Sequence, residues 1–471
     1  MTVCMVNRVH ERCRGYRLRL RDITMTALPD PTDKPAPARL VWSIALPAML
    51  TNIATALFGL ADMWAIGRLG DPAAQGAVEL GAKYMMGLLI VFNFLRTSTV
   101  ALTAQAVGRT DLRAQADTLA RATGVALVIG AGLLVLMPLA IPLGLDLLHA
   151  SGTVRGEAQT YIAIRYWGGP LWLVNCVLVG WLIGQRRVRT VLAVEIAANL
   201  AHIGLDLLLV LGVGWGVAGV AVATLLSEAL KLLAIAVVVA RLPAARDALA
   251  AFTARATWRA APLRKFFALN RDLFARTVLL TAAILIFTRQ GAQMGPVTLA
   301  ANGILFQLFM LATLLLDGFE SASQVLCGEA MGARDRARFV STVRSTMVWG
   351  HVTALAVCAA YLVGGDWLAA SFTTDPAVAR TALRYTGWVT LLPLVGIASF
   401  VLDGVFVGAG WTRAMLGTML VALAIYLTAL TFGAPLGNHG LWLAFTVLFV
   451  ARAAGQFVML PRLIRREFST L

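Results

Sequence analysis

The stretch GRTD at residues 108–111 recurs as GARD at residues 332–335, so Gly108 and Asp111 return 224 positions later as Gly332 and Asp335. The same offset, without a gap, relates further turn and helix-end residues across the rest of each half: Tyr161 with Tyr385, Gly180 with Gly404, Gly184 with Gly408, Arg189 with Arg413, and Gly216 with Gly440. The chain is therefore predicted to contain two copies of one structural unit.

The composition indicates a membrane protein. Hydrophobic residues make up 59% and charged residues 14% of the 471 positions, and the mean hydropathy is +0.78. Soluble domains contain about 25% charged and about 45–50% apolar residues. Apolar runs of about 20 residues, enough to cross a bilayer core of about 30 Å, predict twelve transmembrane helices. These are expected near Leu40–Ile66, Ala77–Leu102, Ala120–Ala140, Ala158–Ile183, Val191–Leu211, Val217–Val239, Phe266–Ala292, Leu299–Leu326, Val343–Leu362, Ala382–Val407, Met415–Phe432 and Leu441–Leu460.

Six helices in each half is an even number, so both halves enter the membrane from the same side. We therefore predict an all-α integral membrane fold in which two parallel six-helix repeats are related by an axis along the membrane normal. The predicted divisions are a disordered cytoplasmic tail (1–38), an N-lobe with helices 1–6 (39–241), a cytoplasmic linker (242–264), and a C-lobe with helices 7–12 and a short basic tail (265–471).

The net charge of +16 would fit a nucleic-acid partner, but its distribution indicates a membrane topology instead. Basic residues gather before the first helix, in alternate loops, in the linker and at the C-terminus, for example at Arg39, Arg109, Arg113, Arg186, Arg187, Arg189, Arg264, Lys265, Arg334, Arg336, Arg338, Arg462, Arg465 and Arg466. The other loops carry few, such as Arg68 and Arg155. This positive-inside pattern predicts that both termini are cytoplasmic, in a multi-pass protein of a bacterial plasma (inner) membrane. The lipid bilayer, and no nucleic acid, is the expected surrounding partner.

Motifs of soluble enzymes are absent from the sequence. There is no GxxxxGK[ST] loop for ATP phosphates and no HExxH pair for zinc. We therefore expect no enzymatic activity, no cofactor and no resident metal, so active transport would draw on an ion gradient. The five cysteines have no CxxC spacing and are expected to be inert. No apolar stretch precedes the first predicted helix, so we expect no signal peptide.

Ionisable side chains at membrane depth are costly unless they are paired or face water, so each is a candidate functional residue. Asp62 lies in LFGLADMWAIGRLG, with no basic residue three or four positions away. Asp206 lies in NLAHIGLDLLLVLG, and His202 and Asn199, four and seven positions earlier, share its helical face. The plain alternatives are a carboxylate held near the headgroups by Arg68, and a purely structural polar cluster.

Other polar residues extend the set of candidates. Thr224 and Glu228 share a face of the sixth helix, although a helical threonine more often bonds its own backbone. Several of the intramembrane charges are expected to form structural ion pairs, and the sequence does not indicate which members of the set do so: Asp317, Glu320, Arg289, Asp403, Arg96, Glu195, Arg165 and His351. We assign Asp62, Asp206, His202, Thr224 and Asn199 to ion coupling. The substrate cavity and its support are assigned Tyr161, Thr55, Arg96, Arg289, Asp317 and Glu320.

Four stretches resemble the MATE (multidrug and toxic compound extrusion) transporters, in particular their DinF-type branch. They are ALPAMLTNIATALFGLADMWAIGRLG (Ala45–Gly70), YIAIRYWGGP (Tyr161–Pro170), NRDLFARTVLL (Asn270–Leu280) and GPVTLAANGILFQLFMLATLLLDGFESASQVLCGEAMGARD (Gly295–Asp335). The resemblance covers the chain from Arg39 to the C-terminus. It implies two six-helix lobes around a V-shaped cavity, and a monomer that exports a small organic molecule in exchange for H⁺ or Na⁺.

The resemblance also assigns ion-coupling roles. The family's aspartates on helices 1 and 5 match Asp62 and Asp206, its helix 6 threonine matches Thr224, and a helix 4 tyrosine matches Tyr161. The family usually has Asn four residues before the helix 5 aspartate, where this chain has His202. An imidazole in place of an amide oxygen disfavours an oxygen cage for Na⁺. We therefore expect H⁺ coupling, with Na⁺ at Asp62 and Asp206 as the alternative, and export of an amphipathic or cationic molecule by alternating access.

Three other functions fit the sequence less well than an exporter does. A flippase for a lipid-linked precursor is kept as the alternative, although such proteins usually need a cationic cavity and this chain places carboxylates in its N-lobe. A major-facilitator transporter would show a GxxxDRxGRR-type signature, which GRTDLRAQ (Gly108–Gln115) fits poorly. A membrane-embedded enzyme would need more than His202 and Asp206.

Overall fold

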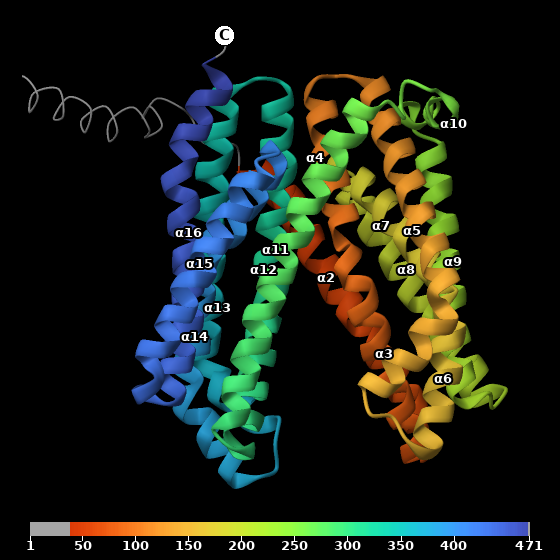
Figure 1. Ribbon diagram of the computed structural model, residues 1–471, viewed down its shortest axis with the longest axis vertical. Helices are drawn as coiled ribbons and strands as arrows, with labels where there is room; N and C mark the ends of the chain where they lie inside the picture. The colour runs from red at the N-terminus through yellow and green to blue at the C-terminus, as the bar shows by residue number, and fades with distance from the viewer. Residues whose placement is uncertain (1–37, 470–471) are drawn as a thin grey trace, which may run out of the picture.

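The computed structural model describes residues 38–469, and the regular structure of this range is helical (Figure 1). The first half consists of α2 (Ala38–Gly67), α3 (Pro72–Ile90), η1 (Val91–Asn93), α4 (Phe94–Gly108), α5 (Leu112–Leu147), α6 (Gly152–Tyr166), α7 (Gly168–Gly184), α8 (Val188–Asp206), η2 (Leu207–Gly212) and α9 (Gly216–Ala240). Two short helices follow, η3 (Pro243–Ala245) and α10 (Ala248–Thr253). The second half consists of α11 (Ala260–Gln293), α12 (Pro296–Gly332), α13 (Arg336–Ser371), α14 (Pro376–Ala409), α15 (Thr412–Gly433), η4 (Ala434–Leu436) and α16 (Asn438–Phe468).

The helices lie where the apolar runs predict them. Within residues 38–469, ten spans are long and apolar enough to cross a membrane, and the pair α6 and α7, bent by 45°, makes an eleventh. Helix α11 has 34 residues and is also long enough, but it carries more charge, including Arg271, Asp272 and Arg276. The predicted all-α membrane fold, with six helical units in each half, is confirmed. The predicted tail, except Ala38, lies outside the described residues.

The repeat of sequence is also a repeat of backbone structure. The Asp111 and Asp335 carboxylates each accept a hydrogen bond from the backbone N–H three residues later, both at 2.9 Å, and so cap α5 and α13. The residues just before these caps, Thr110 and Arg334, both have a left-handed backbone, with φ of 56° and 55°. These pairs are 224 positions apart, so the two halves turn in the same way at the same place.

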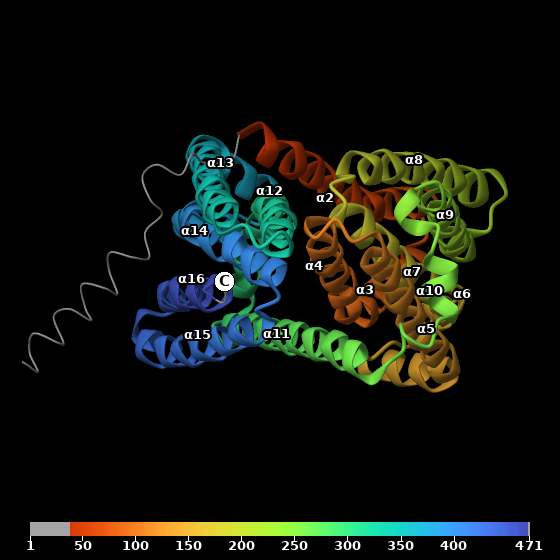
Figure 2. The ribbon, with the colours of Figure 1, turned by 90° about the horizontal axis from the view of Figure 1, so that it is seen from above.

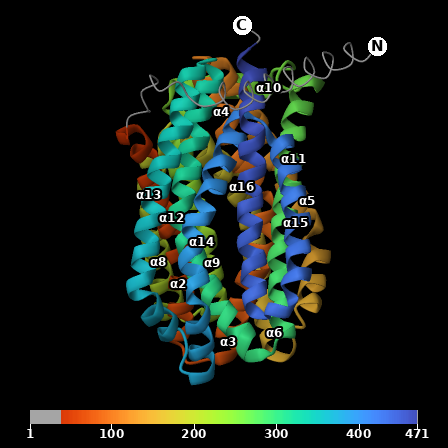
Figure 3. The ribbon, with the colours of Figure 1, turned by 90° about the vertical axis from the view of Figure 1, so that its left-hand side faces the viewer.

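The two halves form two bundles that lie side by side (Figures 1 and 2). The ribbons diverge toward one end and approach each other at the end that carries α10 and the last turns of α16 (Figure 1). Figure 3 shows α10 and the end of α16 together at that end of the molecule. At that end the Gln105 amide donates to the carbonyl oxygen of Gly408 at 2.8 Å, and the Arg186 side chain pairs with Glu329. The molecule therefore has the V shape that was predicted.

Helix α2 belongs to both bundles. Near its start the Trp42 ring packs edge-on against Phe319 of α12, with centroids 5.3 Å apart. The Asn52 amide then donates to the carbonyl oxygen of Leu314 at 3.2 Å. The second half of α2, which contains Asp62, packs on α8 of the N-lobe.

Helix α11 makes the corresponding crossing in the opposite direction. In the first half of α11, Phe274 packs edge-on against Phe94 of α4, at 6.2 Å between centroids. Further along, the carbonyl oxygen of Ala283 accepts a hydrogen bond from the Tyr426 hydroxyl of α15 at 3.2 Å. Figure 2 shows α11 running between the two bundles. Residues 260–264, predicted as linker, already belong to this helix.

The linker before α11 is docked on the N-lobe. The Thr257 hydroxyl donates to Asp117 of α5 at 3.0 Å, and the Arg121 side chain donates to the Thr257 carbonyl oxygen at 3.2 Å. The Trp258 ring covers Gly124 so closely that a Cβ there would overlap it. The connection between the halves is thus tied to α5 before it enters α11.

Candidate functional site in the N-lobe

An imidazole lies between two carboxylates in the interior of the N-lobe. The His202 Nε2 atom is 2.7 Å from Asp62 Oδ1 and 3.2 Å from Asp206 Oδ2. The three residues are almost wholly buried, with exposed fractions of 0% for His202, 1% for Asp206 and 5% for Asp62. Their candidate ligand atoms all lie within 4.8 Å of one another. We call these three residues the coupling cluster, after the role that the sequence analysis predicts for them.

Helix ends and spacing bring these residues together. Asp206 is the last residue of α8, and His202 lies one turn earlier on the same face. The π-helical turn η2 follows immediately, and such wide turns are frequent at functional sites. Asp62 comes from the last turns of α2. The cluster therefore joins the helix that both lobes share to the end of α8.

Helix α9 closes the other side of the imidazole. The Ser227 hydroxyl lies 3.3 Å from His202 Nδ1 and donates to the Thr224 carbonyl oxygen at 2.9 Å. The Thr224 hydroxyl donates to Val220 of its own helix at 2.9 Å. Thr224 therefore contacts Ser227, a neighbour of the cluster, through its carbonyl oxygen, while its hydroxyl bonds the backbone of its own helix, as helical threonines often do. Ser227 was missed, although its position three residues after Thr224 places both on one face.

Asn199, Tyr161 and Thr55 make no hydrogen bond with the coupling cluster among those found within residues 38–469. The Asn199 amide donates to the Ala54 carbonyl oxygen at 2.7 Å, and its Oδ1 has no partner among the described residues. Tyr161 is wholly buried, and its hydroxyl has no partner in that range. The unpartnered oxygens leave room for hydrogen bonds that this conformation does not make.

Thr55 leads to a second polar group of the N-lobe. Its hydroxyl donates to Glu195 Oε1 at 3.2 Å, and the other oxygen of Glu195 pairs with Lys231 Nζ at 2.8 Å. The Asn175 amide donates to Glu228 Oε2 at 2.9 Å. The contact of Lys231 could not be predicted from the sequence, because nothing in the periodicity of α9 indicates which carboxylate faces this lysine.

Three of the residues assigned to the substrate cavity meet between the lobes. A cavity of about 150 Å³ is lined by Asn52, Asn93, Arg96, Thr97, Val100, Ile183, Asp317, Glu320, Ser321 and Gln324. Arg96 comes from α4 of the N-lobe, whereas Asp317 and Glu320 come from α12 of the C-lobe. Arg289 is not part of this group, because it lies exposed near the end of α11.

The C-lobe interior has an ion cluster of different character. The Asp403 carboxylate on α14 pairs with both Arg276 of α11 and Arg452 of α16, and it accepts a hydrogen bond from the Gln456 amide at 2.7 Å. Asp403, Arg452 and Gln456 are each at most 4% exposed. With two guanidinium groups on one carboxylate, this cluster fits the structural ion pair that was expected. Its partners Arg276, Arg452 and Gln456 were not predicted.

Comparison with known proteins agrees with this architecture. The MatE family model matches residues 47–208 and 274–432. DNA damage-inducible protein F of Escherichia coli (strain K12) is 34% identical over 414 residues, which cover 88% of this chain and 90% of that protein. A probable multidrug resistance protein NorM of Bradyrhizobium diazoefficiens is 28% identical, covering 90% of this chain and 93% of that protein.

Solved structures share the fold. An outward-facing multidrug resistance MATE family transporter of the MOP superfamily superposes with a TM-score of 0.82 at 19% identity, covering 93% of this chain and 98% of that one. A MOP superfamily transporter from Pyrococcus furiosus gives a TM-score of 0.80 at 20% identity, covering 92% and 97%. With its multiple membrane spans, its two matched lobes and its similarity to DNA damage-inducible protein F, the chain belongs to the MATE family of membrane transporters, in the DinF-type branch.

Proposed function

We propose that this protein is a secondary active exporter that exchanges H⁺ for an amphipathic or cationic organic molecule by alternating access. The observation that carries the proposal is the position of His202, whose Nε2 lies within 3.2 Å of both the Asp62 and the Asp206 carboxylates. Imidazole and carboxylate side chains can each bind a proton, so these three residues together can take up and release one. Loss or gain of that proton changes the charge of the whole coupling cluster.

The surroundings of His202 suit both of its protonation states. When Nε2–H donates to Asp62, the Nδ1 atom of a neutral ring can accept from Ser227. When the ring is charged, Nδ1–H can donate to the same hydroxyl, because Ser227 donates in turn to the Thr224 carbonyl oxygen. One rotatable hydroxyl thus serves both states. Na⁺ prefers oxygen ligands, as hard cations do, and His202 presents a nitrogen in the space between the two carboxylates.

Helix α2 offers a route from the coupling cluster to the central cavity. Asp62 and Asn52 are ten residues apart on this helix, about 15 Å along its axis. Asn52 lines the cavity between the lobes and donates to the Leu314 carbonyl oxygen of α12. A change in the hydrogen bonds of Asp62 would therefore alter a helix that contacts both lobes. Such an element can shift the balance between two lobe arrangements.

The lining of the central cavity supports a cationic substrate. It contains two carboxylates, Asp317 and Glu320, against one guanidinium, Arg96. Its volume of about 150 Å³ is smaller than the roughly 300–1,000 Å³ of drug-sized sites. In this conformation it would receive a charged end group, such as an amine, with the rest of the molecule lying toward the open end of the V.

We further propose that both termini are cytoplasmic, in a bacterial inner membrane. The lobes meet at the end where the loops are most basic, which positive-inside topology places in the cytoplasm. The conformation described here would then be open to the outside. The protein is proposed to act as a monomer, because each chain contains both lobes and the cavity between them.

Proteoliposomes containing the full-length protein test the proposal. Export of a fluorescent organic cation should respond to an imposed pH gradient without Na⁺, and should not respond to a Na⁺ gradient at symmetrical pH. Transport driven by Na⁺ alone would contradict H⁺ coupling. No transport of any organic cation under either gradient, in a preparation that remains folded, would contradict the exporter function itself.

A further inference from the structure

Two cavities meet along the first turns of α11, away from the coupling cluster. The larger, which we call the basic pocket, has a volume of about 870 Å³ at the end where the lobes touch. Its lining includes six basic side chains, Arg109, Lys265, Arg271, Arg334, Arg413 and Arg466, and two acidic ones, Asp272 and Glu467. The basic excess indicates an anionic ligand.

Asp272, one of the two acidic residues in the lining of the basic pocket, already has hydrogen-bond partners. Asp272 Oδ1 accepts from Arg271 at 2.9 Å, and its Oδ2 accepts from the Thr412 hydroxyl at 3.2 Å. The basic residues come from both lobes, since Arg109 follows α4, Arg334 follows α12 and Arg413 lies in the first turn of α15. A single anion in this pocket would contact both halves of the molecule.

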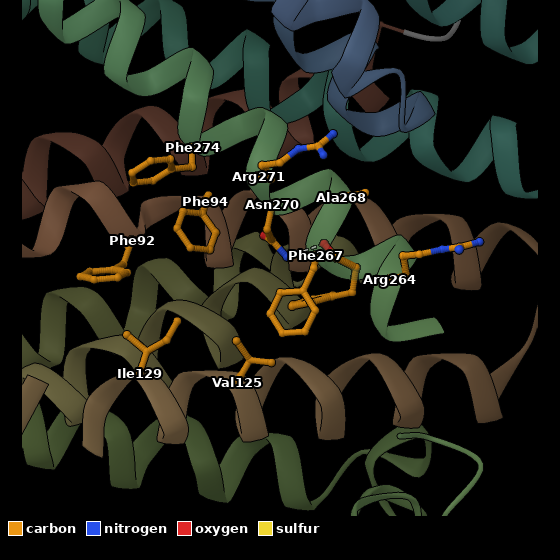
Figure 4. Close-up of a pocket in the computed structure, with 11 residues that line it drawn as sticks. Phe92, Phe94, Val125, Ile129, Arg264, Phe267, Ala268, Asn270, Arg271 and Phe274 are labelled. Atoms are coloured by element: carbon orange, nitrogen blue, oxygen red, sulfur yellow. Dashed lines mark hydrogen bonds between the residues drawn. The ribbon is translucent and has the colours of Figure 1, made fainter. Parts of the chain in front are cut away.

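The second cavity, the aromatic pocket, adjoins the basic pocket. It has a volume of about 500 Å³, and the two pockets share Ala268 and Arg271. Figure 4 shows Phe92 and Phe94 of the α4 region, Val125 and Ile129 of α5, and Phe267 and Phe274 of α11 around it. Phe266 also lines it. An apolar pocket of this kind would receive a hydrocarbon chain.

The length of α11 along the two pockets matches the depth of one membrane leaflet. From Lys265, at the level of the basic pocket, to Phe274 is nine residues, about 14 Å along the helix. This length is about half of a hydrocarbon core of about 30 Å. The pockets therefore extend from the ends of the helices to about the middle of a bilayer, with the charge at the surface and the aromatic side chains inside.

We propose that these two pockets bind an anionic phospholipid of the leaflet at the basic end, with its phosphate headgroup in the basic pocket and an acyl chain in the aromatic pocket. Arginine forms paired hydrogen bonds to phosphate oxygens, which favours a phosphate group. A net negative headgroup gains more from these side chains than a zwitterionic one. Because the basic pocket draws on both lobes, the bound lipid stabilises the arrangement in which the lobes touch at this end.

The full-length protein in detergent micelles allows a direct test. Dioleoylphosphatidylglycerol or dioleoylphosphatidylcholine is titrated, and bound lipid is measured by native mass spectrometry. Phosphatidylglycerol should bind more tightly, and Arg413→Gln should weaken its binding about five-fold, as for loss of one basic contact at a membrane surface. Arg189→Gln is the matched control, because Arg189 is the repeat counterpart of Arg413, is also exposed, and lies outside both pockets.

Two further arms separate a lipid from a free phosphate. Ala268→Trp, which fills the junction of the pockets, should weaken binding of phosphatidylglycerol but not of glycerol 1-phosphate. The exposed Arg334→Gln provides a second charge variant if Arg413→Gln does not fold. Equal binding of the two phospholipids, or equal effects of Arg413→Gln and Arg189→Gln, would overturn the proposal. So would glycerol 1-phosphate binding as tightly as phosphatidylglycerol.

Discussion

Gly108 of the N-lobe lies against the backbone of the C-lobe, and Gly332 of the C-lobe lies in the same way against the backbone of the N-lobe. A Cβ on Gly108 would overlap the carbonyl oxygen of Glu329, and a Cβ on Gly332 would overlap that of Gln105. Gln105 and Glu329 are themselves 224 positions apart (329 − 105 = 224), so the repeat relates the two contacts to each other. The backbones of α4 and α12 can meet here only because neither glycine has a side chain.

Replacing both glycines by alanine should keep the lobes from closing at this end. Alanine favours helix by about 1 kcal/mol over glycine, so each helix remains intact while the new methyl groups separate α4 from α12. Spin labels at positions 187 and 336 should move apart in pulsed electron resonance, and transport should be lost. Gly417→Ala is the control, because nothing lies within 4 Å of its Cβ. An unchanged label distance in the double variant would contradict this role.

Asp62→Asn should abolish coupled export without unfolding the protein. The amide has the shape of a permanently protonated carboxylate, so position 62 can no longer exchange a proton with His202. Efflux of a fluorescent cation is compared at equal membrane levels of each variant. Asp146→Asn, which alters an exposed ion pair with Arg155, should leave efflux unchanged. Wild-type efflux by Asp62→Asn would remove Asp62 from the mechanism.

Two substitutions of His202 should have different consequences. His202→Asn restores an amide oxygen beside the carboxylates and should keep transport while introducing sensitivity to Na⁺. His202→Ala removes the ring that is proposed to carry the proton and should shift the pH profile of transport. It should also cost about 1–3 kcal/mol of stability, because Asp62 loses a buried partner. Identical pH profiles for the wild type and His202→Ala would exclude the imidazole as a proton carrier.

Asp403→Asn should destabilise the C-lobe more than a comparable change at the surface. It removes the carboxylate that pairs with both the Arg276 and the Arg452 guanidinium groups in the protein interior, and breaking a buried pair costs about 3–5 kcal/mol. Thermal unfolding in detergent should show a clear decrease in Tm. The control Asp366→Asn changes an exposed carboxylate that accepts a hydrogen bond from Thr386. A decrease no larger than that of the control would show that the cluster contributes little to stability.

The proposed topology predicts which loops are accessible to a membrane-impermeant thiol reagent. Cysteines at positions 187 and 334 should react only from the cytoplasmic side, and a cysteine at position 155 only from the outside. Native Cys176, Cys327 and Cys358 are buried and should stay unlabelled, whereas Cys4 and Cys13 are replaced by serine. Labelling from the reverse sides would invert the topology.

Local spacing explains why the coupling cluster could be predicted. His202 and Asp206 are one helical turn apart, and a stretch resembling a known family motif contains Asp62. The partners of Asp403 could not be predicted in this way. Arg276 is 127 positions and Arg452 49 positions from Asp403 in the sequence, and helical periodicity does not encode which helices face each other. Arg289 was selected only for its depth in a predicted span, and the structure places it on an exposed surface.

Hydropathy likewise predicted the spans but not their neighbours. The apolar runs at Leu40–Ile66 and Phe266–Ala292 indicate a helix in each case. They do not indicate that the first helix of each half leaves its own bundle, because lipid and protein surroundings select the same apolar residues. The two pockets beside α11 depend on that crossing and so could not be predicted either.

The sharing of α2 has a consequence for biosynthesis. Trp42 and Asn52 emerge early, yet their partners Phe319 and Leu314 belong to α12, which ends at Gly332. At about 5–20 residues per second, roughly 15 to 60 seconds of translation separate the start of α2 from the end of α12. During that interval the packing surface of the first helix must face lipid or an insertion factor. A gene divided at the linker would encode two halves that each lack part of the contact surface for their own first helix.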